Sequence, residues 1–142
     1  MASRLRMQRL DPAAILPARA HPDDAGLDLR ALDAVEIAPG RGVKIRTGIA
    51  MEIPQGFVGM IADRSSLAAR GLKTAGGIID SGYRGEVQIV MRNLTHEGQR
   101  LEAGERMAQL LIIPVALPEV EEVSGLSESA RAQGGFGSTG RN

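Results

Sequence analysis

Apolar and polar residues alternate along much of the chain, and this period of two is typical of β-strands with one buried face. The alternation runs over residues 35–53 and again over residues 86–93. A segment with proline and glycine interrupts the first stretch at residues 39–42, and another follows it at 54–56. Such segments are typical of turns between strands. A more continuous apolar run over residues 107–115 is typical of a strand covered on both faces. The pattern therefore predicts an all-β fold of short strands, a sandwich or a barrel.

Two segments depart from this alternation. Residues Ser66–Arg70, followed by Gly71, predict a helix of one or two turns with serine at its start and glycine at its end. From about Glu119 the alternation is lost in a polar stretch that is rich in glycine and serine. We expect one domain over residues 1–118, and a C-terminal strand with a flexible arm over residues 119–142.

Composition and charge exclude several classes of function. The 142 residues suffice for one core, and 17 basic residues balance 17 acidic ones, so no net charge attracts nucleic acid. The absence of cysteine excludes disulfides, thiol catalysis and cysteine-bound zinc, and His21 and His96 are too far apart in sequence to suggest a metal-binding pair. The longest apolar run, 107–117, is broken by Gln109 and Pro114. We therefore expect a cytoplasmic protein with neither a nucleic-acid nor a membrane partner.

The few aromatic residues and the many glycines point to where the chemistry lies. Phe57, Tyr83 and Phe136 are the only aromatic residues, so the core must be aliphatic. The 18 glycines cluster in segments that also carry isolated charges and rings. Five segments are therefore candidates for a site, and they cover residues 25–31, 63–68, 76–86, 104–110 and 131–140.

In the first two segments, charged and hydroxyl groups stand beside apolar residues. Asp28 lies in the sequence AGLDLRA, where it is either a functional acid or a solvated residue at the start of a strand. Arg64, Ser65 and Ser66 stand at the start of the expected helix. Such an arrangement builds an anion site, although a simple helix cap explains it equally well.

The other three segments combine glycine with single polar or aromatic side chains. In GGIIDSGYRGE, glycines flank Asp80 and Tyr83, so this hairpin can bring its backbone against a flat ligand; an ordinary glycine-rich hairpin is the alternative. Gln109 places one amide in an apolar strand, where it could also satisfy a backbone group of the core. Arg131 and Phe136 stand in RAQGGFGSTG, and a plain disordered tail would need no phenylalanine.

The order and combination of AGLDLRA, RSSLA, GIIDSGYRGE, GERMAQ and RAQGGFGSTG resemble the five motifs of the trimeric dUTPase family (deoxyuridine 5'-triphosphate nucleotidohydrolases) over roughly residues 5–140. The resemblance implies a jelly-roll-like β-barrel that forms a homotrimer with active sites shared between subunits. It also implies Mg²⁺-assisted hydrolysis of dUTP to dUMP and pyrophosphate, which limits uracil incorporation into DNA and supplies dUMP for dTMP synthesis.

The resemblance also assigns roles to individual residues. Asp80 matches the general base that activates the attacking water, and the ring of Tyr83 matches the group that packs on the deoxyribose and excludes a 2′-hydroxyl. Asp28 and Gln109 match positions that hold the hydration shell of Mg²⁺ through water. The positions matched to substrate contacts are Arg64, Ser65, Ser66, Gly77, Ile78, Ile79, Tyr83, Gln88, Gln109, Arg131, Phe136, Gly137 and Ser138.

The sequence departs from the common pattern of that family in four places. Gly82 stands where many relatives have an acid, Asp63 where proline or glycine is usual, and Ala132 where glycine is common. The connection over residues 69–77 is shorter than in many bacterial relatives, which leaves Thr74 as a candidate for a side-chain contact to uracil.

Two other functions remain open at this point. A dCTP deaminase shares the implied fold and an RSS-type segment, but it lacks a GGFGSTG arm of this kind. A non-catalytic nucleotide-binding relative would keep the fold and lose Asp80 or the arm, and this chain has both.

Overall fold

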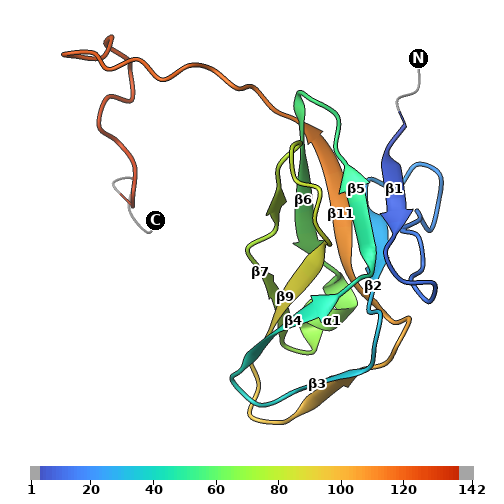
Figure 1. The fold of residues 1–142 in the computed structure, drawn as a ribbon. Helices are drawn as coiled ribbons and strands as arrows, with labels where there is room; N and C mark the ends of the chain where they lie inside the picture. The colour runs from blue at the N-terminus through green and yellow to red at the C-terminus, as the bar shows by residue number, and fades with distance from the viewer. Residues whose placement is uncertain (1–3, 138–142) are drawn as a thin grey trace.

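The computed structural model describes residues 4–137, and in this range the chain forms 11 strands and one short helix (Figure 1). The alternating stretches become β3, β4, β5 and β9, and the continuous apolar run becomes β11, so these expectations are confirmed. The elements are β1 (Arg6–Arg9), β2 (Leu27–Arg30), β3 (Val35–Ile37), β4 (Gly42–Arg46), β5 (Ile49–Glu52), β6 (Phe57–Asp63), α1 (Ser65–Ala69), β7 (Leu72–Ala75), β8 (Ile78–Ile79), β9 (Gln88–Asn93), β10 (Gln99–Leu101) and β11 (Arg106–Pro114).

The strands form four antiparallel sheets around one core. A four-stranded sheet has the order β2-β11-β6-β8, a three-stranded sheet has the order β4-β9-β7, and β1-β5 and β10-β3 form two pairs. The strand β11 lies between β2 and β6, which explains its continuous apolar sequence. The fold is the jelly-roll-like, all-β arrangement that was expected. Within residues 4–137, the pairing does not run continuously around the core.

The core is aliphatic, as the shortage of aromatic residues requires. Leu29, Ile37, Ile49, Leu101 and Leu110 are completely buried. Each such side chain stabilises the fold by about 1.5–3 kcal/mol relative to an exposed one. Of the aromatic residues, Phe57 packs against the edge of the core, whereas Tyr83 and Phe136 are exposed. These two exposed rings are therefore not needed for the core.

The helix α1 begins one residue earlier than the sequence indicated, and its cap is different. Arg64, in an extended conformation, is the N-cap residue, and its side chain makes no capping hydrogen bond. The expectation of a serine cap is therefore wrong. Because the helix starts at Ser65, both serines lie in its first turn with exposed side chains, and Leu67 anchors it in the core.

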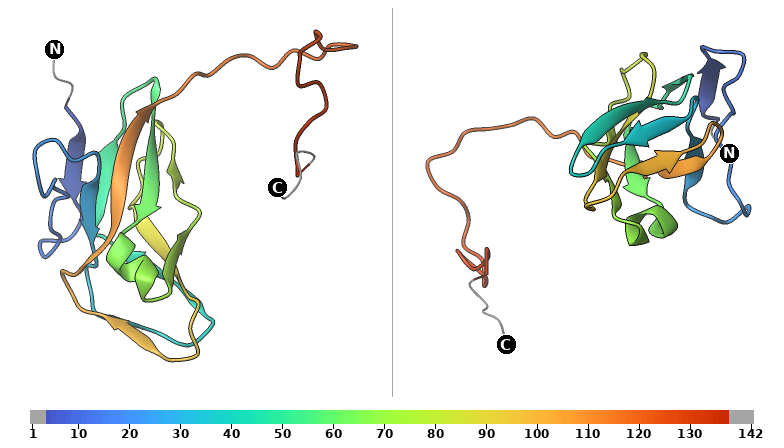
Figure 2. Two further views of the ribbon diagram at one scale, coloured as in Figure 1. Left: turned by 180° about the vertical axis from the view of Figure 1, so that it is seen from behind. Right: turned by 90° about the horizontal axis from the view of Figure 1, so that it is seen from below.

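The chain after β11 leaves the sheets and extends away from them in every view (Figures 1 and 2). Residues 115–137 contain no strand, so the strand expected after residue 118 is absent from the part of the arm that the structure describes. The exposed apolar side chains of Leu117, Val120 and Leu126 lie along this segment. No helix among residues 4–137 has the length and apolarity needed to cross a membrane.

One buried side chain, Asn93 at the end of β9, ties three parts of the fold together. Its amide nitrogen donates to the carbonyl oxygens of Ile37 (3.0 Å) and Glu97 (2.7 Å). Its oxygen accepts from the backbone nitrogen (2.9 Å) and the hydroxyl (2.7 Å) of Thr95. The side chain therefore satisfies backbone groups that strand pairing leaves over.

Replacement Asn93→Ala should lower the free energy of unfolding by about 2–4 kcal/mol, because it leaves the Ile37 carbonyl and the Thr95 amide without this partner in a buried place. Urea unfolding followed by circular dichroism measures the change. The neighbouring Leu94→Ala, which truncates an exposed side chain, serves as the control and should change stability little. Equal stability of the two variants would contradict the role given to Asn93.

Candidate active site

A pocket of about 400 Å³ opens beside the glycine-rich connection between β8 and β9. Six of the residues singled out from the sequence line it: Gly77, Ile78, Ile79, Asp80, Tyr83 and Gln88. The other lining residues are Lys44, Ile61, Glu86, Val87 and Val90. Glu86 lies in the candidate segment 76–86 but received no role from the sequence, and sequence reasoning missed the other four. Lys44 and Val90 are paired across β4 and β9, so the outer face of the three-stranded sheet forms one wall.

A tight turn places the acid and the ring of this pocket together. The backbone nitrogen of Tyr83 donates to the carbonyl oxygen of Asp80 at 3.1 Å, which brings the two residues to one side of the turn. Both side chains are exposed, and Tyr83 keeps 46% of its surface accessible. The turn thus presents a carboxylate and a ring face to a ligand rather than to the core.

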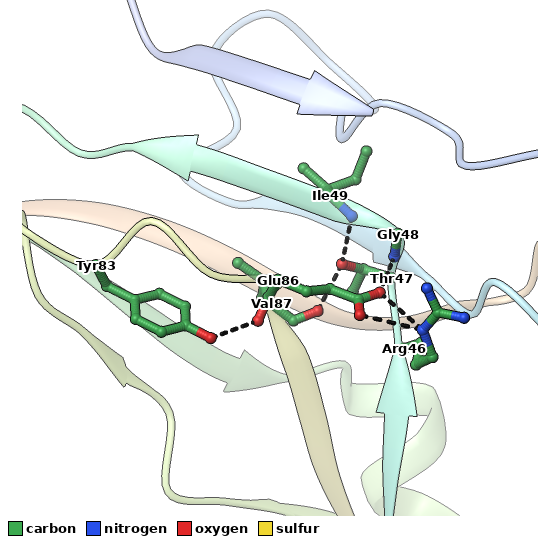
Figure 3. A network of polar contacts seen from close by, with 7 residues as sticks. All are labelled: Arg46, Thr47, Gly48, Ile49, Tyr83, Glu86 and Val87. Carbon is green, nitrogen blue, oxygen red and sulfur yellow. Dashed lines mark hydrogen bonds and ion pairs between the residues drawn. The ribbon is translucent and has the colours of Figure 1, made fainter. Parts of the chain in front are cut away.

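The position of the Tyr83 ring is fixed by the segment that follows it (Figure 3). The hydroxyl of Tyr83 donates to the carbonyl oxygen of Glu86 at 2.8 Å. Gly85 lies under the ring, and a Cβ atom there would stand 2.5 Å from the Tyr83 hydroxyl oxygen. Only glycine therefore allows the ring to lie against this turn.

The side chain of Glu86 in turn locks this segment to the end of β4 (Figure 3). Its carboxylate accepts from Arg46 Nε at 3.1 Å and from the backbone nitrogen of Gly48 at 2.7 Å. Hydrogen bonding and charge from Glu86 raise the pKa of Arg46 above its usual value. Beside it, the buried hydroxyl of Thr47 donates to the carbonyl oxygen of Val87 at 2.6 Å. We call these four residues, Arg46, Thr47, Gly48 and Glu86, the Glu86 network.

A second group of predicted residues lies where β6 ends and α1 begins. Arg64, Ser65 and Ser66 sit where β6 gives way to α1, and the Nη1 atom of Arg64 donates to the carbonyl oxygen of Arg106 at 3.2 Å. Because neither serine caps the helix, both hydroxyls face solvent beside a guanidinium group. One cation and two hydroxyls on one exposed turn are a combination that binds phosphate oxygens.

Asp28 and Gln109 are direct neighbours in this second group. They are register partners across β2 and β11. An oxygen of Asp28 lies 3.6 Å from Arg106 Nη1, and the amide nitrogen of Gln109 donates to the carbonyl oxygen of Asp63 at 2.8 Å. The amide of Gln109 thus does satisfy a backbone group, as the alternative interpretation held. Its oxygen points toward Gly26, where a Cβ atom would stand 2.2 Å away.

Thr74, the candidate for a uracil contact, is occupied elsewhere. Its side chain is buried, its hydroxyl donates to Asp63 Oδ1 at 2.6 Å, and it does not line the pocket. The structure therefore speaks against this candidate.

Asp63 is held by several donors. Lys73 Nζ lies 2.6 Å from Oδ2, and the backbone nitrogen of Thr74 lies 2.7 Å from Oδ1. Burial by itself raises the pKa of Asp63, but the hydrogen bonds from Lys73 and Thr74 and the charge of Lys73 outweigh it, so its pKa lies below the usual value.

The third group, in the C-terminal arm, is separate from both others within one chain (Figure 2). Arg131 closes a small turn, in which its carbonyl oxygen accepts from the backbone nitrogen of Gly134 at 2.9 Å. Ala132 and Phe136 both have a φ of 48°, and the positive φ at Ala132 gives a physical reason for glycine being common at this position. The ring of Phe136 and the backbone of Gly137 are exposed, and Ser138 lies outside the described residues.

A pocket with an open carboxylate and a ring, and a separate turn with a cation and hydroxyls, offers the contacts that the base, sugar and phosphates of a nucleotide need. Comparison with known proteins makes this specific. A family model described as dUTPase matches residues 13–140. The chain is 44% identical to the deoxyuridine 5'-triphosphate nucleotidohydrolase of Mycobacterium leprae, over 99% of this chain and 97% of that protein. It is 44% identical to the protein of that name from Streptomyces avermitilis, over 94% of this chain and 79% of that one.

Solved structures agree with this relationship. A mutant dUTPase of Staphylococcus bacteriophage 80alpha, determined with dUpNHpp, superposes with a TM-score of 0.93 at 30% identity, over 99% of this chain and all of that one. A mutant dUTPase from phage phi11 of S. aureus, whose structure shows how a structural Mg(II) ion is coordinated, has a TM-score of 0.82 at 27% identity. The match spans 87% of this chain and 98% of the phi11 enzyme.

The chain belongs to the dUTPase family. Its activity is that of a dUTP diphosphatase, which hydrolyses dUTP.

The low pKa of Asp63 predicts a pH-dependent contribution to stability. A carboxyl whose pKa is lower in the folded state stabilises the fold above its unfolded pKa, and this stability is lost as the pH falls through the folded pKa. Urea unfolding midpoints of the unchanged protein and of Asp63→Asn should therefore differ most near neutral pH and converge in acid.

Glu36→Gln provides the control, because Glu36 forms an ion pair with Arg100 at 3.2 Å but is largely exposed. Its effect should be small throughout, as is usual for exposed pairs. A gap between Asp63→Asn and the unchanged protein that stays constant from neutral pH into acid would contradict the account.

Proposed function

We propose that Asp80 is the general base of dUTP hydrolysis in this chain. In this reaction the water oxygen bonds to the α-phosphorus, the bond from that phosphorus to the bridging α,β-oxygen breaks, and dUMP and pyrophosphate leave. Asp80 takes the proton from the water as the new bond forms. The observation that carries this assignment is the exposed carboxylate of Asp80 in the wall of the pocket, on the same turn as the exposed ring of Tyr83.

The pocket supports a specific arrangement of the nucleoside. The backbone of Gly77–Ile79 and the side chain of Gln88 border it, so they can read the edge of uracil. The ring of Tyr83, fixed by its hydrogen bond to Glu86, would pack on the deoxyribose and leave no room for a 2′-hydroxyl. Because the Glu86 network holds that ring, we infer that the network supports discrimination between dUTP and UTP.

The phosphates are proposed to lie against Arg64, Ser65 and Ser66. The neighbouring oxygen groups of β2 and β11 suit Mg²⁺. Asp28 and Gln109 offer a carboxylate and an amide oxygen side by side, and these are the hard oxygen groups that the ion prefers. Within residues 4–137, no cluster of three or more acidic, histidine or cysteine side chains could hold a metal ion alone.

This donor set therefore fits an ion that keeps most of its waters and is held through them by Asp28 and Gln109. When bound, Mg²⁺ supplies charge neutralisation to the phosphate oxygens. Arg64 and the two serines orient the triphosphate by donating hydrogen bonds to its oxygens. The dUpNHpp bound in the 80alpha enzyme supports binding of a dUTP-like ligand by members of the family, and the structural Mg(II) ion of the phi11 enzyme shows that a relative binds Mg²⁺.

We further propose that the working enzyme is a homotrimer whose sites combine groups from different subunits. In one chain, the pocket, the phosphate-binding turn and the arm form three separate groups, and the arm points away from the sheets (Figure 2). We keep the division into a domain over residues 1–118 and an active-site arm over 119–142, in which Arg131 and Ser138 reach the γ-phosphate and Phe136 covers uracil with Gly137 beside it. Because its substrate belongs to the pool of DNA precursors, we propose that the enzyme acts in the cytoplasm.

Replacement Asp80→Asn should lower kcat by about 10²-fold or more with little change in KM, since it removes the proton acceptor and keeps the shape. Steady-state release of pyrophosphate from dUTP measures both constants. Asp23→Asn, which alters an exposed carboxylate in the loop before β2, is the control and should leave both unchanged. Near-normal turnover of Asp80→Asn would exclude Asp80 as the base.

Truncation after Ser129 should leave a stable trimer and lower kcat/KM on the order of 10²-fold, the scale on which misplacing a substrate affects rate. Phe136→Ala should lose less, about 0.5–1.5 kcal/mol or roughly 2- to 13-fold, because it removes one aromatic contact. Native mass measurement and kcat/KM at fixed Mg²⁺ give the result, with Leu126→Ala, another exposed apolar residue of the arm, as the control. If the arm has no role, the truncated protein should keep full activity, and that result would contradict the proposal.

A further inference from the structure

Asp63 closes the loop that carries the phosphate-binding residues. It is the last residue of β6, and its carboxylate accepts from Lys73 Nζ (2.6 Å), the Thr74 backbone nitrogen (2.7 Å) and the Thr74 hydroxyl (2.6 Å), both residues belonging to β7. The strands β6 and β7 belong to different sheets. The carboxylate therefore joins two sheets where no strand pairing does, at the base of the loop 64–72.

The segment inside this loop needs such a tie. Its helix α1 has five residues, far fewer than the roughly 12–15 that an isolated helix needs to be even marginally stable, and it has no side-chain cap. Leu67 anchors one face of it in the core. The direction of Arg64 and Ser65 therefore depends on how the two ends of the loop are held.

The main chain of Asp63 connects the phosphate-binding turn to β11, the strand that carries Gln109. Its carbonyl oxygen accepts from the Gln109 amide at 2.8 Å, and its Cα is the register partner of Ala108 in β11. Asp63 is thus fixed by β11 through its backbone and by β7 through its side chain. A displacement of Asp63 would therefore shift Arg64, which follows it, and would disturb the hydrogen bond from the Gln109 amide.

The ion pair also removes an electrostatic conflict. An unpaired carboxylate directly before Arg64 would repel a triphosphate. The 2.6 Å contact with Lys73 balances that charge locally, and the side chain of Asp63 is only 22% exposed.

We propose that Asp63 is a positioning residue for the triphosphate of the substrate: with Lys73 and Thr74, it fixes the turn that presents Arg64 and Ser65 to the phosphates. This inference rests on the proposed function of that turn. It assigns a role to an acid that the family resemblance did not match to any contact with the substrate. Asp63 itself does not touch the reacting atoms.

The test compares two ligands in the full-length protein. The affinity for dUpNHpp reports on the whole triphosphate, and the affinity for dUMP reports on a ligand without the β- and γ-phosphates. In Asp63→Ala, dUpNHpp should bind about tenfold more weakly and kcat should fall at least as much, while dUMP binding stays within about twofold. Asp63→Asn keeps an oxygen for the Thr74 donors, so its affinity for dUpNHpp should lie between those of Asp63→Ala and the unchanged protein. Glu36→Ala, which also removes a paired carboxylate, is the control and should bind dUpNHpp as the unchanged protein does.

Each outcome separates this inference from its alternatives. Equal weakening of dUMP and dUpNHpp in Asp63→Ala would mean a general structural role and would overturn the proposal, as would unchanged affinity for both. Because dUMP binding requires a folded pocket, it also shows that the variant is folded. If the unchanged protein itself fails to favour dUpNHpp over dUMP, the proposed function of the phosphate-binding turn fails first, and this inference with it.

Discussion

The fixed register of β11 between β2 and β6 is the constraint on which the proposed phosphate site depends. One strand pairing sets Gln109 opposite Asp28, and the other sets Ala108 opposite Asp63. Because side chains alternate along a strand, a slip of one residue would turn the Gln109 amide into the opposite face. The buried residues Met107 and Leu110 stand on either side and resist such a slip. The aliphatic core thus holds the polar groups in place without taking part in the chemistry.

Two polar ties extend this order to residues outside the regular sheets. The Glu86 network joins the end of β4 to the segment that anchors the Tyr83 ring, and Asp63 joins the end of β6 to β7. Neither tie is proposed to touch the substrate. Each holds a residue that is proposed to do so, Tyr83 in one case and Arg64 in the other. Short strands and a five-residue helix provide little local rigidity, so charged hydrogen bonds at their ends supply it.

The sequence predicted those parts of the fold in which local pattern and burial agree. β3, β4, β5, β9 and β11 follow the alternation or the continuous apolar run. β6 escaped notice because its burial does not alternate clearly, and β10 because it is a short, mostly polar strand. The pocket residues Asp80 and Tyr83 were found from a motif, and Gln88 only from the family resemblance.

The residues that were missed depend on strands far apart in the chain. Lys44 reaches the pocket through pairing with Val90, and Arg46 meets Glu86 across 40 residues. No local sequence pattern contains that information, since it arises when the sheets pack.

The most direct test of the whole account is the release of pyrophosphate by the full-length protein from dUTP, compared with dCTP, dTTP and UTP under the same conditions with Mg²⁺. A pocket that reads uracil and excludes a 2′-hydroxyl predicts rapid release from dUTP and, at equal concentration, far slower release from each of the other three. Comparable release from UTP or dCTP, or ammonia released from dCTP, would contradict the site described for Tyr83, Asp80 and the glycine-rich hairpin.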